Sequence, residues 1–290
     1  MTDLRKRLVS NGILLVPGIY DALSGTLAER SGAEAVYLSG AAVAYTRLGR
    51  PDIGLVSMSE MAETVALVRD RVGLPLIVDA DTGYGNALNV ERTVRIFERA
   101  GASAIQLEDQ SYPKRCGHLS EKNLIPAAEM AGKIRAALAA RASRDTLVIA
   151  RTDALEAEGF DAAISRAGTY AAAGADVLFV EAPRSNDELA AIPRALGGIA
   201  PLMANMVEGG RTPVRSAPEL ESLGYALAIF PGGAVRAIAH TLGDFYTTLV
   251  RDGTSGSFRQ RMLDFDGLNT ALGTSELLGR GKRYEGETGR

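Results

Sequence analysis

Three carboxylates stand at the ends of two apolar runs in the first half of the chain. Asp79 and Asp81 close the run that begins at Leu76, and Glu108 closes the next run. The Asp-x-Asp spacing predicts that both side chains lie on one face of a strand. Mg²⁺ prefers oxygen ligands, takes one or two carboxylates directly and keeps several waters. We therefore predict a Mg²⁺ site, with Mn²⁺ as the second choice of ion; the alternative is a structural network of salt bridges.

The chain's single cysteine has neighbours that suit chemistry. Cys116 follows Lys114 and Arg115 and precedes Gly117 and His118. This is the composition of a loop, whereas a lone cysteine is more often a small buried apolar residue. Nearby cations lower the pKa of a thiol and make proton transfer at neutral pH feasible. A metal beside an activated thiol indicates carbanion or enolate chemistry, so we interpret the protein as an enzyme.

The elements that must position these residues follow from an alternation along the chain. Eight short, continuous apolar runs are typical of parallel strands that are covered on both faces. They span residues 13–16, 35–38, 76–80, 103–107, 146–150, 176–180, 201–204 and 225–230. Segments with helical periodicity separate them, at residues 22–31, 59–71, 90–100, 127–141, 161–173, 186–196, 218–223 and 234–250.

Strand alternating with helix eight times predicts an α/β fold, a (β/α)₈ TIM-type barrel. A doubly wound sheet is the alternative, but Val16-Pro17-Gly18 is not the Gly-rich phosphate turn expected there. We predict helix N-caps at Ser57 or Ser59, Asn89 and Asp161, and αL glycines at Gly32, Gly101 and Gly174. We expect one catalytic domain over residues 1–256 and a helical appendix over 257–290, whose part from Gly279 onward frays.

Polar residues follow most of the predicted strands. In a barrel of this type the active site lies at the carboxyl ends of the strands. The residues at these ends are Tyr37, Ser39, Gly40, Asp79, Asp81, Glu108, Arg151, Asp153, Glu181 and Asn205. Several of these side chains would cost several kcal/mol to bury unpaired, which favours a functional site.

Composition excludes several classes of protein. The 290 residues are 46% hydrophobic and 23% charged, with a formal net charge of −3, which is ordinary for a soluble globular protein. No basic stripe indicates nucleic-acid binding, and no apolar stretch approaches the ~20 residues of a membrane span. One cysteine cannot form an internal disulfide. We expect a cytoplasmic protein without nucleic-acid or membrane partners.

The motifs together resemble the isocitrate lyase and phosphoenolpyruvate mutase superfamily, and most of all its 2-methylisocitrate lyase and 2-methylmalate or dimethylmalate lyase branches. The resemblance covers residues 15–250. It rests on Tyr37-Leu38-Ser39-Gly40, Gly49-Arg50-Pro51-Asp52, Asp79 to Gly85, Glu108-Asp109-Gln110, Lys114 to His118, Ala150 to Ala154 and Asn205-Met206. The Lys-Arg-Cys-Gly-His run is the lyase hallmark, and the mutase branch typically lacks its cysteine.

The resemblance implies a role for each matching residue. Asp79 and Asp81 would hold Mg²⁺ with Glu108 in its outer sphere, and Cys116 would be the general acid, supported by Lys114 and His118. Arg151 would stabilise the developing oxyanion. The substrate-binding residues would be Tyr37, Ser39, Gly40, Ala41, Asp52, Gly117, Glu181, Asn205 and Arg236. The family's final helices are exchanged between subunits, usually in a homotetramer, and the appendix would fit that exchange.

The implied reaction is a retro-aldol (Claisen-type) cleavage of a 2-hydroxy dicarboxylate to a 2-oxo acid and a carboxylate. The chain departs from methylisocitrate lyases at Val207 to Gly210, at Phe230 to Gly233, and at Phe265, where those enzymes carry a substrate-binding arginine. These departures favour a smaller dicarboxylate such as a 2-alkylmalate. The alternatives are a phosphonomutase, an oxaloacetate decarboxylase or hydrolase, and a non-enzymatic binding protein.

Overall fold

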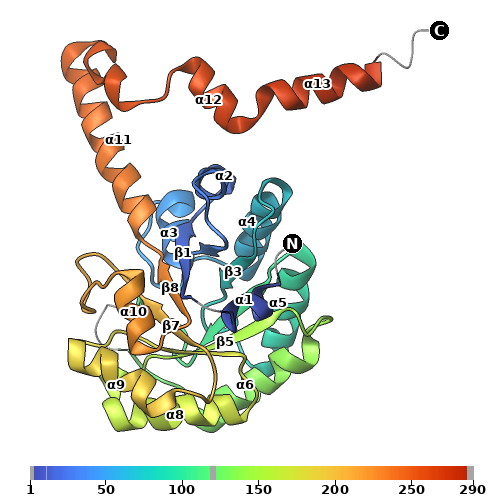
Figure 1. Cartoon of the computed structure of the whole chain (residues 1–290), viewed down its shortest axis with the longest axis vertical. Helices are drawn as coiled ribbons and strands as arrows, with labels where there is room; N and C mark the ends of the chain where they lie inside the picture. The colour runs from blue at the N-terminus through green and yellow to red at the C-terminus, as the bar shows by residue number, and fades with distance from the viewer. Residues whose placement is uncertain (1–2, 11, 118–121, 286–290) are drawn as a thin grey trace. The chain divides into compact units, whose positions relative to one another are not determined.

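The computed structural model of the protein describes residues 3–10, 12–117 and 122–285 (Figure 1). Eight parallel strands close into a barrel in chain order, with β8 paired to β1, which confirms the predicted fold. The strands are β1 (Leu14–Ile19), β2 (Val36–Leu38), β3 (Leu76–Asp79), β4 (Ala104–Glu108), β5 (Leu147–Thr152), β6 (Val177–Val180), β7 (Leu202–Asn205) and β8 (Leu227–Phe230).

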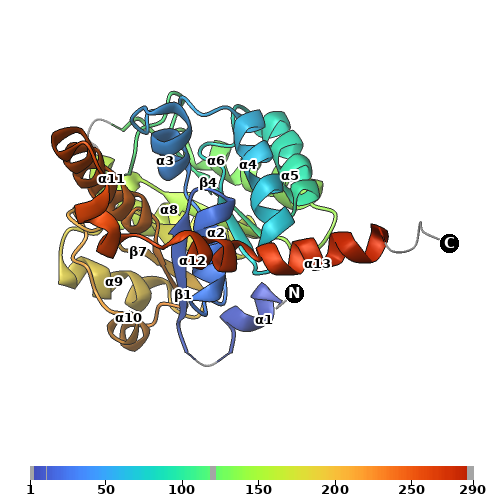
Figure 2. The ribbon, with the colours of Figure 1, turned by 90° about the horizontal axis from the view of Figure 1, so that it is seen from above.

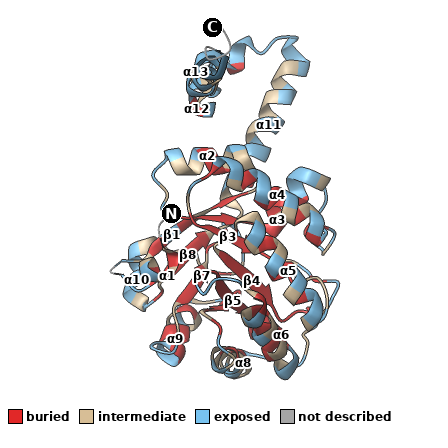
Figure 3. Ribbon diagram, turned by 90° about the vertical axis from the view of Figure 1, so that its right-hand side faces the viewer, coloured by how far each residue is buried: buried red, intermediate tan, exposed pale blue. Residues whose placement is uncertain are grey.

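All eight predicted long helices are present. They are α2 (Ala22–Arg30), α4 (Met58–Arg71), α5 (Ala87–Ala100), α6 (Ala127–Ala140), α8 (Phe160–Ala172), α9 (Asn186–Leu196), α10 (Ala217–Leu223) and α11 (Gly233–Asp252). From α2 to α9, consecutive long helices lie side by side, as α4 and α5 do in Figures 1 and 2. The buried strands are enclosed by helices such as α5, α6, α8 and α9, whose outer faces are exposed (Figure 3).

The barrel buries apolar side chains on both faces of its strands. On β3, Ile77 belongs to the cluster inside the barrel, whereas Leu76 and Val78 pack in the layer between strands and helices. Successive side chains of a strand point to opposite faces, so a strand that is buried on both faces reads as a continuous apolar run. This is why the strands were visible in the sequence.

Several short elements lie outside the predicted pattern. These are α1 (Leu4–Leu8), α3 (Gly40–Val43), the π-helical turn η1 (Ala44–Leu48) and α7 (Ala154–Ala157). Each has about one turn, which is too short to show a helical period. Two of them, α3 and α7, begin directly after residues of the predicted site, Ser39 and Asp153.

The predicted helix caps are confirmed in part. Ser57 caps α4, and Gly32, Gly101 and Gly174 have φ of 87°, 105° and 103°. Asn89 is wrong as a cap: Asn86 accepts hydrogen bonds from the amides of Leu88 and Asn89, and the helix begins one turn earlier. The prediction for Asp161 is also wrong, because it lies in the first turn of α8 after Gly159.

The chain divides into two compact units, Met1–Val235 and Arg236–Arg290. The second unit contains most of α11, the 3-10 helix η2 (Gly256–Arg261), α12 (Phe265–Leu272) and α13 (Thr274–Glu285). The predicted division at residues 256 and 257 stays a prediction. The predicted fraying is wrong for residues 279–285, which continue α13; cations in its last turn favour a helix end. None of the described helices is long and apolar enough to span a membrane.

Candidate active site

The carboxyl ends of neighbouring strands bring the predicted residues together. Asp79 ends β3, Glu108 ends β4 and Asn205 ends β7, while Glu181 follows β6. Strand register places Glu108 directly beside Arg151 of β5. In a parallel barrel all of these ends open on one face, which is the face that carries active sites in this fold.

Asp79 and Asp81 do not share a strand face as predicted. β3 ends at Asp79, and Asp81 has a left-handed backbone with φ of 48°. The two carboxylates still meet beside Gly40, where an added Cβ would lie 3.1 Å from Asp79 Oδ2 and 3.4 Å from Asp81 Oδ1. A left-handed non-glycine residue costs about 1 kcal/mol or more, and such residues cluster at functional sites.

The carboxylate cluster suits a hydrated cation. Both carboxylate oxygens of Glu108 and the hydroxyl of Tyr84 are buried without a hydrogen bond from the described residues, although Glu108 forms an ion pair with Arg151. Burial raises the pKa of Glu108, against the opposing charge of Arg151. Burial also raises the pKa of Asp81 to about 7, although Lys114 opposes this. Raised pKa values of buried carboxyl groups indicate too little neighbouring positive charge, and waters around a cation would donate to Glu108 and Tyr84.

The cluster is not a closed protein cage. Within the described part of the chain, no three Asp, Glu, His or Cys side chains are close enough to hold one metal ion together. Mg²⁺ commonly takes one or two carboxylates and completes its octahedral shell with water and substrate oxygens. The residues present therefore fit Mg²⁺ held by Asp79 or Asp81, with Glu108 acting through water.

Lys114 is buried among these carboxylates. Its Nζ lies 2.5 Å from Asp52 Oδ1 and 2.8 Å from Asp81 Oδ1. Burial by itself would lower the pKa of Lys114, but the surrounding carboxylates raise it well above its usual value. The ammonium therefore stays charged and balances part of the negative charge of the site.

Cys116 lies at the rim of this cluster and is half-buried. Its amide donates to the carbonyl of Asp52 over 3.2 Å. At Gly117 an added Cβ would lie 2.3 Å from Arg151 Nη2 and 2.6 Å from Glu181 Cγ, so the Gly117 backbone packs closely against both side chains. His118 lies outside the described residues, and its role stays a prediction.

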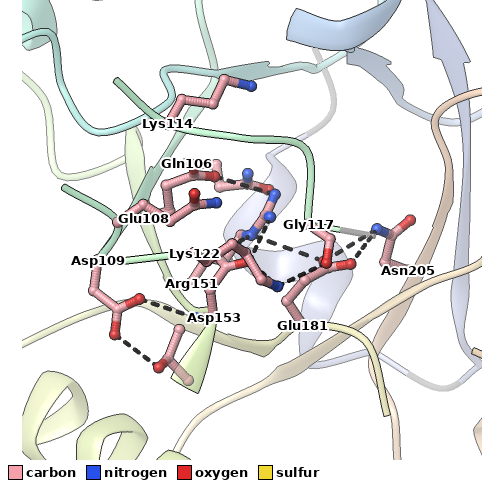
Figure 4. Close-up of polar contacts among 12 residues, drawn as sticks. Gln106, Glu108, Asp109, Lys114, Gly117, Lys122, Arg151, Asp153, Glu181 and Asn205 are labelled. Carbon is pink, nitrogen blue, oxygen red and sulfur yellow. Dashed lines mark hydrogen bonds and ion pairs between the residues drawn. The ribbon is translucent and has the colours of Figure 1, made fainter. Parts of the chain in front are cut away.

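Arg151 occupies the centre of the mouth (Figure 4). Its Nε and Nη2 each donate to Asp153 over 2.9 Å, and its Nη1 lies 3.1 Å from Glu108 Oε2. Burial opposes the charge of Arg151, but the carboxylates around it raise its pKa well above the usual value. Asn205 Nδ2 donates to Glu181 over 3.1 Å. A cation held on fixed partners is suited to stabilise negative charge that develops in the pocket.

The remaining predicted residues are placed as follows. Ser39 caps α3, which leaves the backbone of Gly40 and Ala41 at the helix start. The hydroxyl of Tyr37 is buried inside the barrel and donates to Gln106 over 3.0 Å. Arg236 begins the second unit, so its place in the substrate pocket stays a prediction.

Three neighbours of the site received no role in the sequence analysis, although Asp109 belongs to one of the motifs that carry the resemblance. Gln106 donates to Asp79 Oδ1 over 3.3 Å, and Asp109 accepts from the amide of Asp153 and from Thr152 Oγ1. Lys122 contacts Gly117 and Asp153. A polar residue within the apolar run of β4 was a signal for Gln106. No sequence signal marked Lys122, because the fold brings it together with carboxylates that are distant in the sequence.

Known proteins share this architecture. Residues 4–249 match the family described as phosphoenolpyruvate phosphomutase. The 2,3-dimethylmalate lyase of Eubacterium barkeri is 39% identical over 94% of each chain. The 2-methylisocitrate lyase of Aeropyrum pernix is 49% identical over 81% of this chain and 74% of its own.

Solved structures agree with these relatives. A crystal structure of 2,3-dimethylmalate lyase, described as a PEP mutase/isocitrate lyase superfamily member, matches with a TM-score of 0.92 and 34% identity over 98% of this chain and 94% of that one. Phosphonopyruvate hydrolase in complex with oxalate and Mg²⁺ matches with a TM-score of 0.88 and 31% identity, over 97% and 98% of the two chains. The chain therefore belongs to the isocitrate lyase and phosphoenolpyruvate mutase superfamily.

Proposed function

We propose that this protein is a Mg²⁺-dependent carbon–carbon lyase that cleaves a 2-hydroxy dicarboxylate into a 2-oxo acid and a carboxylate. One observation carries the proposal: the segment of Cys116 and Gly117 lies against Arg151 and Glu181, on the same barrel face as the Asp79 and Asp81 carboxylates. The residue that follows the proposed proton donor thus contacts a fixed cation, and a donor next to a cation is what protonation of an enolate-like anion requires.

Each residue has a defined part in this reaction. When bound at Asp79 or Asp81, Mg²⁺ would hold the substrate's C1 carboxylate and acidify its 2-hydroxyl. A base takes the hydroxyl proton, the C2–C3 bond breaks, and its electron pair passes into the second carboxylate. Arg151 stabilises the resulting dianion, and the thiol of Cys116 gives its proton to C3. Lys114 keeps the surrounding carboxylates charge-balanced.

We propose a 2-alkylmalate, such as 2,3-dimethylmalate, as the substrate. By the resemblance to methylisocitrate lyases, Phe265 lies where those enzymes would carry a substrate-binding arginine. A substrate with two carboxylates needs fewer cations than one with three. The match to a dimethylmalate lyase over nearly the whole chain supports the same choice.

The test is release of a 2-oxo acid, followed with coupled lactate dehydrogenase, from methylisocitrate, isocitrate, 2-methylmalate, 2,3-dimethylmalate and oxaloacetate. We expect pyruvate from an alkylmalate, and we expect EDTA to abolish it. Much faster cleavage of methylisocitrate would contradict the substrate assignment but not the lyase.

A phosphonomutase is the second candidate, because the matched family carries that description. A mutase has no need of an acidic thiol. Silence on all five compounds, together with turnover of carboxyphosphonoenolpyruvate or phosphonopyruvate, would replace the lyase with this activity. An oxaloacetate decarboxylase would release pyruvate from oxaloacetate in the same panel. A hydrolase would release oxalate and acetate, which lactate dehydrogenase does not reduce, so its activity is measured as the loss of oxaloacetate.

We further propose a homotetramer in the cytoplasm. The second unit exposes large apolar side chains on α12 and α13, among them Phe265 and Leu278. Such a surface is suited to a partner subunit. A free thiol with a catalytic role stays reduced in the cytoplasm.

A further inference from the structure

A lysine outside the predicted site, Lys122, is buried against the segment that carries the thiol. Its side chain is 0% exposed. Its Nζ donates to the carbonyl of Gly117 over 2.7 Å and lies 3.0 Å from Asp153 Oδ1 and 3.3 Å from Glu156 Oε2 (Figure 4). An ammonium group has three donors and no acceptor; two of the donors are used on Gly117 and Asp153, and the contact with Glu156 is an ion pair.

These partners connect Lys122 with both groups that we assign to chemistry. Asp153 Oδ1 accepts from Lys122 and also from Arg151 Nη2, at 2.9 Å. Gly117 is the residue next to Cys116. One ammonium therefore fixes the carboxylate that orients Arg151 and the peptide that follows the thiol.

Cys116 is restrained on its other side as well. Its amide donates to the carbonyl of Asp52, and Asp52 is itself held by Lys114. With Lys122 on the following peptide, the backbone is fixed on both sides of the thiol. A hydrogen bond from a charged donor shifts the equilibrium between a held and a released backbone about tenfold or more.

We propose that Lys122 is a positioning residue, which holds the peptide after Cys116 and the carboxylate of Asp153 so that thiol and guanidinium face the same substrate carbon. This rests on the proposed lyase function. The alternative is a purely structural ion pair with Glu156, which also pairs with Arg211. If Lys122 has only a structural role, its loss lowers the free energy of unfolding. If it is a positioning residue, its loss also changes the accessibility of the Cys116 thiol.

The chain's single cysteine makes this distinction measurable. The experiment compares the rate at which iodoacetamide alkylates Cys116 in the wild type, Lys122→Met, Lys122→Arg and Lys133→Met. Each rate is measured at the alkaline pH above which it no longer rises. The thiol is then fully ionised, so differences in rate report the accessibility of Cys116. Lys133 is the matched control: it is also buried and also donates to a carbonyl, that of Thr82, over 3.0 Å.

We expect Lys122→Met to raise the alkylation rate about tenfold or more, and Lys122→Arg to return it toward the wild-type value. Lys133→Met should leave the rate unchanged. In the lyase assay, Lys122→Met should lower kcat much more than it raises KM. If Lys122→Met does not fold, Lys122→Gln, which keeps an uncharged NH₂ donor group but loses the charge, carries the same comparison.

An alkylation rate in a folded Lys122→Met or Lys122→Gln variant that equals those of the wild type and Lys133→Met would overturn the proposal. A wild-type protein that cleaves no 2-hydroxy dicarboxylate, while the Lys122 variants still expose the thiol, would refute the lyase and leave the positioning role intact. The two failures are therefore distinguishable.

Discussion

Cys116 is the residue on which the proposed chemistry depends. It is half-buried, and its backbone is held against the residues that would meet the substrate. A serine at this position keeps the shape but is a far weaker acid. We expect Cys116→Ser to lower kcat about 10²- to 10⁴-fold, the usual contribution of a positioned general acid.

The control for Cys116→Ser is Mg²⁺ binding, measured by calorimetry. It should not change, because the predicted metal ligands lie on β3 and the loop after it. A variant that keeps most of its turnover would show that the thiol is not the acid, and would favour the phosphonomutase.

The raised pKa of Asp81 predicts how the affinity for Mg²⁺ depends on pH. In the metal-free protein its pKa is raised to about 7 by burial, against the opposing effect of Lys114. Below that pH the carboxyl holds a proton that Mg²⁺ must displace, and above it the carboxylate has already lost that proton. We therefore expect Mg²⁺ affinity to fall by up to about tenfold per pH unit below about pH 7, and to level off above it.

Calorimetry at several pH values, in buffers of different ionisation enthalpy, checks this expectation through the affinity and through the proton released. Asp81→Asn should lower the affinity and remove the pH dependence. An affinity in the wild type that is the same at pH 6 and pH 8 would count against Asp81 as a ligand.

At the scale of elements, the loop after β4 must approach the ends of β5 and β6 closely. Gly117 makes this approach possible, because a Cβ would lie 2.3 Å from Arg151 Nη2. We expect Gly117→Ala to lower kcat about 10²-fold, since a displacement of about 1 Å costs that much. The lyase assay measures this directly.

Gly168 in α8 is a matched control for Gly117, because nothing lies within 4 Å of a Cβ added there. Gly168→Ala should keep full activity and raise the free energy of unfolding by about 0.5–1 kcal/mol, as alanine favours a helix. Equal activities of the two alanine variants would show that the close approach at Gly117 has no catalytic role.

At the scale of the whole molecule, the exposed apolar side chains of the second unit predict that the protein forms an oligomer. No residue of α13 is buried within the described chain, and Phe265 of α12 is 83% exposed. We expect Phe265→Asp combined with Leu278→Asp to convert a tetramer into smaller species, because charge at an apolar interface opposes association.

Light scattering after size exclusion measures the mass of each species. Lys282→Asp, a charge change at another exposed position of α13, should leave the tetramer intact. A wild-type protein that is monomeric at micromolar concentration would refute the predicted assembly.

The sequence by itself determined the order of strands and helices and the face on which chemistry occurs. The strands of the barrel are buried on both faces, so Leu76 to Val78 read as one apolar run, and the polar residues that end such runs stand out. The proposed metal ligands and Arg151 were visible in this way, because each carries a charged group at or next to a strand end. The thiol was visible from the cations and the glycine around it in the loop.

Only the tertiary structure decided which of these groups touch. The left-handed backbone that turns Asp81 beside Asp79 depends on one dihedral angle. The pairing of Lys114 with Asp52 and that of Lys122 with Asp153 join residues far apart in the sequence. Local patterns report burial and periodicity, whereas these contacts are set by how strand ends converge in the closed barrel. A buried charge in a loop therefore has no sequence signal until the fold supplies its partners.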